Sequence, residues 1–173
     1  MPHILALTLL LNIHNLAAVP ASVIRTAHDE VVRLFDAIGV RIDTADAADT
    51  DPSVSLDVIL IPDATGDLRR ERDSVMGATV WTFKGTPVVY VFYRRVQSES
   101  ERYAASTVLV LACTLAHELG HVLLADRGHA AEGLMRPSWN RDDLLRAEQG
   151  RLRFLPEDAA RIRARLLETT VEQ

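Results

Sequence analysis

Two histidines separated by three residues stand at the end of a long apolar stretch, in the segment His117-Glu118-Leu119-Gly120-His121. Residues four apart on a helix lie on the same face, with Cβ atoms about 5–6 Å apart. Both imidazoles can therefore reach one metal ion, and zinc prefers imidazole nitrogens in tetrahedral geometry. The spacing predicts a helix that carries two metal ligands near its end.

Glu118 directly follows the first histidine, so it points away from the face that carries His117 and His121. A carboxylate in that position is better placed to hold a metal-bound water than to bind the metal. It can take a proton from that water and pass it on, which is the work of a general base and then a general acid. The residues therefore predict a catalytic role for Glu118.

A catalytic zinc takes three protein ligands, so one more must come from outside this helix. Gly128 is expected to end the helix, because glycine readily adopts the left-handed conformation that follows many helices. His129 comes one residue later, where a reversed chain returns toward the metal, and we expect it to be the third ligand. Asp126 and Glu132 are competing donors, whereas Arg127 stays protonated and cannot serve.

The HExxH motif, the later His129 and the segment Gly133-Leu134-Met135 resemble the metzincin clan of zinc metallopeptidases. The chain is more similar still to short bacterial zincin-like proteins, from about Leu7 to Leu167, although only His117 to Met135 is specific. The resemblance implies a zincin-like twisted mixed sheet, one zinc ion per chain and hydrolysis of peptide bonds by a metal-activated water. It also implies a Met-turn that places the Met135 thioether beneath the metal.

The chain departs from the longer metzincin motif just after the second histidine. That motif has glycine three residues further on and its third histidine three residues after the glycine, where this chain has Leu124 and Arg127. The helix is therefore expected to run further and to turn differently before His129.

A predicted strand from Ala78 to Phe83 has a specific role in the clan that this chain resembles. There the strand before the last one borders the cleft, runs antiparallel to the others and can hydrogen-bond an extended peptide as an added strand. An ordinary edge strand is the alternative. The resemblance implies that the substrate contacts Ala78, Thr79, Val80 and Trp81.

The apolar periodicity of the whole chain indicates an α/β (α+β) fold, with a twisted sheet backed by helices. Strands are predicted at Ile4–Ile13, Val40–Asp43, Leu56–Ile61, Ala78–Phe83 and Val88–Tyr93. Helices are predicted from Pro20 to Gly39, from Ser100 to Ala125 as one long helix, from Arg141 to Gln149 with Asn140 as its cap, and from Pro156 to about Thr169.

Length and composition are those of an ordinary globular protein, with 173 residues, 48% of them hydrophobic and 25% charged. One domain over residues 1–173 is expected, and the net charge of −5 argues against a nucleic-acid surface. The apolar run Val108–Ala116 is too short to span a bilayer, and Cys113 within it is expected to be a core residue. The expected partner is a peptide or protein substrate, and the oligomeric state stays open.

The segment from His3 to Val19 is apolar and could be mistaken for a secretory signal. A signal requires a positively charged residue before its apolar part, and no Lys or Arg precedes this segment. A cytoplasmic location is the default expectation, with secretion after processing as the alternative.

A second function is compatible with the same residues: a zinc-binding protein without general protease activity. Such a protein either cuts one partner only or uses the metal to hold its fold. A position left open at the metal favours the enzyme, and a fourth protein ligand favours the structural role. Trp139 either lines the cleft or packs against the turn at Met135.

Overall fold

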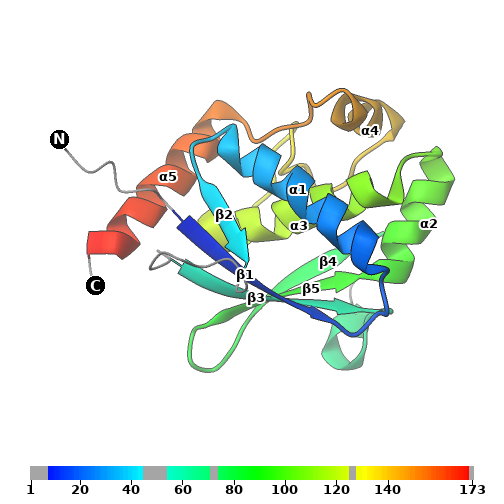
Figure 1. The fold of residues 1–173 in the computed structure, drawn as a ribbon, viewed down its shortest axis with the longest axis horizontal. Helices are drawn as coiled ribbons and strands as arrows, with labels where there is room; N and C mark the ends of the chain where they lie inside the picture. The colour runs from blue at the N-terminus through cyan, green and yellow to red at the C-terminus, as the bar shows by residue number, and fades with distance from the viewer. Residues whose placement is uncertain (1–7, 45–53, 71–73, 125–127, 172–173) are drawn as a thin grey trace.

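The structure is a computed structural model that describes residues 8–44, 54–70, 74–124 and 128–171 (Figure 1). Along the chain the elements are β1 (Thr8–Asn15), α1 (Ala21–Asp36), β2 (Arg41–Thr44), β3 (Val54–Ile61), the 3₁₀ helix η2 (Gly66–Arg70), β4 (Gly77–Trp81), β5 (Pro87–Phe92), α2 (Tyr93–Tyr103), α3 (Thr107–Leu124), α4 (Arg141–Glu148) and α5 (Pro156–Val171).

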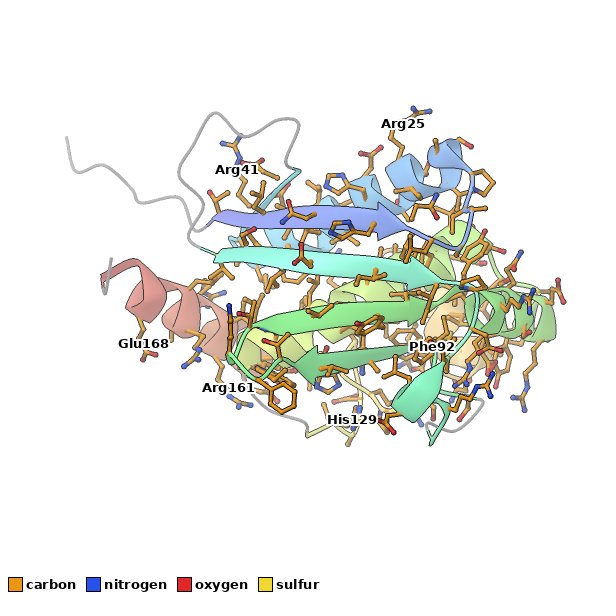
Figure 2. All side chains as sticks on the ribbon, turned by 90° about the horizontal axis from the view of Figure 1, so that it is seen from below. Arg25, Arg41, Phe92, His129, Arg161 and Glu168 are labelled. Atoms are coloured by element: carbon orange, nitrogen blue, oxygen red, sulfur yellow. The ribbon has the colours of Figure 1, made fainter. Side chains whose placement is uncertain are left out.

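The five strands form one mixed sheet in the order β2-β1-β3-β5-β4. Strands β2, β1, β3 and β5 are parallel to one another, whereas β4 pairs antiparallel with β5 and lies at the edge. Figure 2 views the sheet from the side opposite the helices, with the strands in front and α1 and α3 behind them. The predicted mixed α/β fold, with β4 as its antiparallel edge strand, is confirmed.

Side chains that alternate along the strands form the core between the sheet and the helices. In β3 the buried positions are Leu56, Val58 and Leu60, and in β5 they are Val89 and Val91, with Phe92 also buried at the strand end. This alternation is expected because successive side chains of a strand point to opposite faces of the sheet. One face of the sheet therefore packs against α1 and α3.

Helix α3 runs through the centre of the molecule and packs against α1, α2, α5 and β4. It is long and apolar enough to cross a membrane by length and composition, but 72% of that window is buried inside the fold. This burial is the pattern of a core helix whose apolar surface is covered on every side by other elements.

The prediction of one long helix from Ser100 to Ala125 is wrong. The segment contains two helices, because α2 ends at Tyr103 and Ala104 adopts a left-handed conformation with φ +53°. The chain then turns into α3, and the hydroxyls of Ser100 and Thr107 lie 2.8 Å apart across the break. Helix α2 also begins at Tyr93, which the sequence pattern places in the preceding strand.

The other predicted helices are present with small shifts at their ends. Helix α4 begins with a capping box, in which the Asp143 backbone N–H donates to the Asn140 side chain and the Asn140 backbone N–H donates to the Asp143 carboxylate. Strand β1 begins at Thr8, and the predicted strand residues Ile4 to Leu7 lie outside the described residues.

Candidate metal centre

His117 and His121 lie one turn apart near the end of α3, on the same face of the helix, as their spacing predicts. Their Nε2 atoms are 3.0 Å apart. Both side chains are buried, with 8% and 7% of their surface exposed. The two nitrogens are therefore close enough to share one metal ion.

His129 joins these two residues from the loop after α3. The ligand atoms of all three histidines lie within 4.8 Å of one another. The ring of His129 is exposed, and its centroid lies 5.3 Å from that of His117 and 4.9 Å from that of His121. Figure 2 shows His129 beyond the β4 edge of the sheet.

Of the two competing donors, the structure describes only Glu132. Glu132 is exposed and does not belong to the histidine cluster. Asp126 and Arg127 lie outside the described residues, so the structure does not compare Asp126 with His129.

A tight loop holds His129 and the first histidine together. The backbone N–H of Ala130 donates to the carbonyl of Met135 at 2.9 Å, which closes the loop. Gly133 turns the chain with φ +77°, a conformation that favours glycine. The carbonyl of Leu134 then accepts a hydrogen bond from Nδ1 of His117 at 2.9 Å. Because a carbonyl can only accept, Nδ1 carries the proton and Nε2 keeps its lone pair for the cluster.

Met135 packs beneath the helix that carries the histidines. Its side chain is 1% exposed and approaches α3 where residue 120 is glycine. A Cβ atom at Gly120 would lie 2.5 Å from Met135 Sδ and 3.0 Å from Phe154 Cε1. The absence of a side chain at Gly120 therefore permits the close approach of the Met135 thioether.

Glu118 lies against β4 and is 6% exposed. The hydroxyl of Thr79 donates to Glu118 Oε2 at 3.0 Å and lies 3.2 Å from the Glu118 carbonyl oxygen. Gly77 leaves room for the same side chain, because a Cβ atom there would lie 2.7 Å from Glu118 Cγ. Sequence reasoning missed both contacts, since no local pattern relates β4 to a helix some forty residues later.

Trp139 packs against His117. The two rings are nearly perpendicular, at 88°, with centroids 5.7 Å apart. The indole is 7% exposed, and its N–H has no hydrogen-bond partner among the described residues. The Arg136 guanidinium donates to the Asp143 carboxylate at 2.6 Å and ties this segment to α4.

The pKa of His117 is lowered to about 4, chiefly by burial; the bond to the Leu134 carbonyl raises it, and the neighbouring His121 and His129 lower it. His117 is therefore neutral at neutral pH. Metal binding requires a neutral imidazole, so the environment of His117 suits a ligand.

Comparisons with known proteins were made at the level of sequence and of structure. No protein-family model matches the chain, and no curated protein matches it. The fold is similar to that of a zinc-dependent peptidase from Methanocorpusculum labreanum (strain Z), with 16% identity and a TM-score of 0.54 over 90% of this chain and 99% of that chain.

A second solved structure, the GM1-bound form of the ECX AB5 holotoxin, matches with 13% identity and a TM-score of 0.43, over 92% of this chain and 79% of that chain. This second likeness is too weak to carry an argument. The first is a likeness of fold, and it agrees with the predicted zincin-like sheet.

Proposed function

We propose that this chain is a zinc-dependent endopeptidase in which His117, His121 and His129 hold one zinc ion and Glu118 transfers the proton. The observation that carries the proposal is the cluster of three histidines whose ligand atoms lie within 4.8 Å of one another. Glu118 follows the first of them directly in the chain. The similar fold of a zinc-dependent peptidase supports the same reading.

The geometry of the histidines fits zinc. Zinc–nitrogen bonds of about 2.0–2.1 Å in a tetrahedron put two ligand nitrogens about 3.3 Å apart. The Nε2 atoms of His117 and His121 are 3.0 Å apart in the structure. The hydrogen bond from His117 Nδ1 to the Leu134 carbonyl is the kind of outer contact that orients a metal-bound imidazole.

The chemistry divides between the metal and one carboxylate. Zinc, when bound, polarises a carbonyl and lowers the pKa of water to about 7. Glu118 accepts a proton from the attacking water while the water oxygen bonds to the carbonyl carbon of the peptide. Glu118 then donates that proton to the amide nitrogen as the carbon–nitrogen bond breaks.

Strand β4 is proposed to bind the substrate as an added strand, through Ala78, Thr79, Val80 and Trp81. The N–H of Phe92 bonds to the carbonyl of Met76, and antiparallel pairing then alternates the inward and outward backbone groups along β4. The backbone groups of Gly77 and Thr79 consequently face away from β5. An extended peptide at this edge would lie beside Glu118, which supports the proposed substrate site.

Met135 is proposed to form the apolar floor of the metal site, in the manner of a Met-turn. Its burial and its approach to Gly120 support this role. Leu134 lies in the same turn and bonds to His117, so a hydrogen bond joins the turn that carries Met135 to the first proposed ligand.

The alternative function is a zinc-binding protein without general protease activity. A structural zinc site is usually closed by four protein ligands. Within the part of the chain that the structure describes, the cluster contains three histidines and no fourth His, Cys, Asp or Glu. This composition supports the catalytic reading over the structural one.

Metal analysis tests the site first. We expect about one zinc per chain in the wild type and loss of zinc from His117→Ala and His121→Ala. His14→Ala is the matched control, because His14 is an exposed histidine paired with Asp57 on the sheet. Stoichiometric zinc in the double variant His117→Ala/His121→Ala would contradict the site.

The third ligand is tested by measuring zinc binding in alanine variants of His129, Glu132 and Asp126. His129→Ala should weaken zinc binding strongly, and Glu132→Ala should leave it unchanged, because Glu132 lies outside the cluster. A strong loss in Asp126→Ala, with little effect in His129→Ala, would move the assignment to the aspartate.

Hydrolysis is tested by digesting a peptide library with the zinc-loaded protein. Glu118→Gln should keep zinc and fold but lose about 10²–10⁴-fold in rate, because an amide cannot accept the proton of water. Near-normal turnover in this variant would remove Glu118 from the mechanism. No cleavage by the wild type would favour the alternative function.

A further inference from the structure

We propose that Thr79 is the residue that positions the Glu118 carboxylate, so that the strand expected to bind the substrate also orients the general base. This inference rests on the proposed function. It starts from one contact, the hydrogen bond of 3.0 Å from Thr79 Oγ1 to Glu118 Oε2. It names a role for Thr79 that goes beyond backbone pairing with a peptide.

This contact matters because the carboxylate is buried. A buried polar group that loses its partner is destabilised by its full desolvation, and hydrogen bonds to a charged group are about twice as strong as neutral ones. Glu118 is 6% exposed. The Thr79 hydroxyl therefore restrains the position of Oε2.

A second residue of the same strand shapes the same side chain. A Cβ atom at Gly77 would lie 2.7 Å from Glu118 Cγ and 2.9 Å from Oε1. Gly77 and Thr79 are two apart, so they share the face of β4 that meets α3. Gly77 leaves the space that the Glu118 side chain fills, and Thr79 holds one oxygen of its carboxylate.

The position of Thr79 in β4 links two tasks. Its side chain points to Glu118, and its backbone groups face the free edge of the sheet, as the alternation from Met76 and Phe92 implies. A peptide bonded to the Thr79 backbone would therefore restrain the strand that carries the hydroxyl. Substrate binding and orientation of the base would then depend on one residue.

Kinetics of three variants test this role. Thr79→Val keeps the shape of the side chain and removes the hydroxyl, and we expect kcat to fall about tenfold with KM within about twofold, since only the orientation of the base is lost. Thr79→Ser restores the hydroxyl and should recover most of kcat. Thr82→Val, which removes an exposed hydroxyl of the same hairpin, is the matched control.

A thermodynamic cycle tests the contact without any substrate. Urea unfolding at a fixed, saturating zinc concentration is compared for wild type, Thr79→Val, Glu118→Met and the double variant. The contact of Thr79 with the Glu118 carbonyl oxygen is lost equally with either side chain at 118, so it cancels. We expect the two changes to be coupled by about fivefold or more in the unfolding equilibrium constant.

The outcomes separate this proposal from the proposed function. Independent effects of the two substitutions on unfolding would overturn the contact. Coupled unfolding with unchanged kcat in Thr79→Val would overturn the positioning role. If the zinc-loaded wild type cuts no peptide, the proposed function fails, and the cycle alone still decides whether Thr79 holds Glu118.

Discussion

Gly120 directly precedes His121 in α3 and lies against Met135, so replacing it by alanine tests how tightly this region is packed. The new Cβ atom would lie 2.5 Å from Met135 Sδ, 3.1 Å from Met135 Cε and 3.0 Å from Phe154 Cε1. Real Cβ atoms rarely approach other heavy atoms so closely, so at least the Met135 side chain must move. Met135 is 1% exposed and Phe154 is 6% exposed, which leaves little space for that movement.

Two opposing terms set the magnitude. Overpacking a buried site destabilises a protein by about 1–3 kcal/mol. Alanine favours the helix over glycine by about 1 kcal/mol. The first term exceeds the second when the neighbours cannot relax, so we expect Gly120→Ala to lower the free energy of unfolding by up to about 2 kcal/mol.

The assay is urea unfolding of Gly120→Ala, Met135→Ala and the double variant. Truncating Met135 removes its Sδ and Cε atoms, which are two of the three atoms nearest to the new Cβ; the third belongs to Phe154. The double variant should therefore be more stable than the sum of the single effects predicts, by about 1–2 kcal/mol. Gly120→Ala should also bind zinc more weakly, because movement of Met135 shifts the neighbouring Leu134 carbonyl that bonds to His117.

One pair of results would refute this reasoning. If Gly120→Ala raised the free energy of unfolding by about 1 kcal/mol, the helix propensity of alanine would be acting alone. If its effect also added simply to that of Met135→Ala, the thioether would not press against residue 120. The support of the metal site by Met135 would then be lost as an explanation.

Two further predictions concern Glu118 and His117. Gly77→Ala should reduce hydrolysis at least tenfold without loss of zinc, because the new Cβ would lie 2.7 Å from Glu118 Cγ and would push that side chain away. Peptide cleavage and metal analysis measure the two effects. In the zinc-free protein, the pKa of His117 is held at about 4, below the value of 6.5 for an unburied histidine. Its contribution to stability is therefore complete above about pH 6.5 and is lost as the pH falls toward 4, so the urea midpoint should fall over this range less steeply in His117→Gln.

The sequence predicted those parts of the site that depend on local geometry. The spacing of His117 and His121 specifies one face of a helix wherever that helix lies, and their Nε2 atoms are 3.0 Å apart. The cap at Asn140 is equally local, because its partner Asp143 stands three residues away. His129 lies with the other two histidines, as predicted, whereas the expected helix end at Gly128 follows residues outside the described part of the chain.

The break at Ala104 could not be predicted in the same way. Neither proline nor glycine marks it, and a left-handed alanine is unfavourable by about 1–2 kcal/mol. Tertiary packing must offset that penalty, since α2 and α3 both bury apolar side chains after the chain turns. A pattern of apolar residues that continues through the break therefore suggested one helix.

The contacts of Glu118 depend on how β4 is placed against α3, and single-sequence reasoning has no access to that placement. Thr79 and Gly77 stand in an ordinary apolar strand, and nothing near them in the chain refers to a carboxylate. Their role follows only from distances in the folded protein, namely the 3.0 Å hydrogen bond and the 2.7 Å approach.

The site is built on one helical turn whose adjacent residues are held by different parts of the chain. His117 is fixed by the Leu134 carbonyl in the loop after α3, whereas Glu118 is fixed by Thr79 in β4. The two hydrogen bonds have no residue in common, so each can be removed by substitution without removing the other. Changes at Gly120 or Met135 should act first on zinc affinity, and changes in β4 should act on the rate while zinc stays bound. A variant of Thr79 that lost zinc as readily as one of Met135 would show that the two supports are not separate.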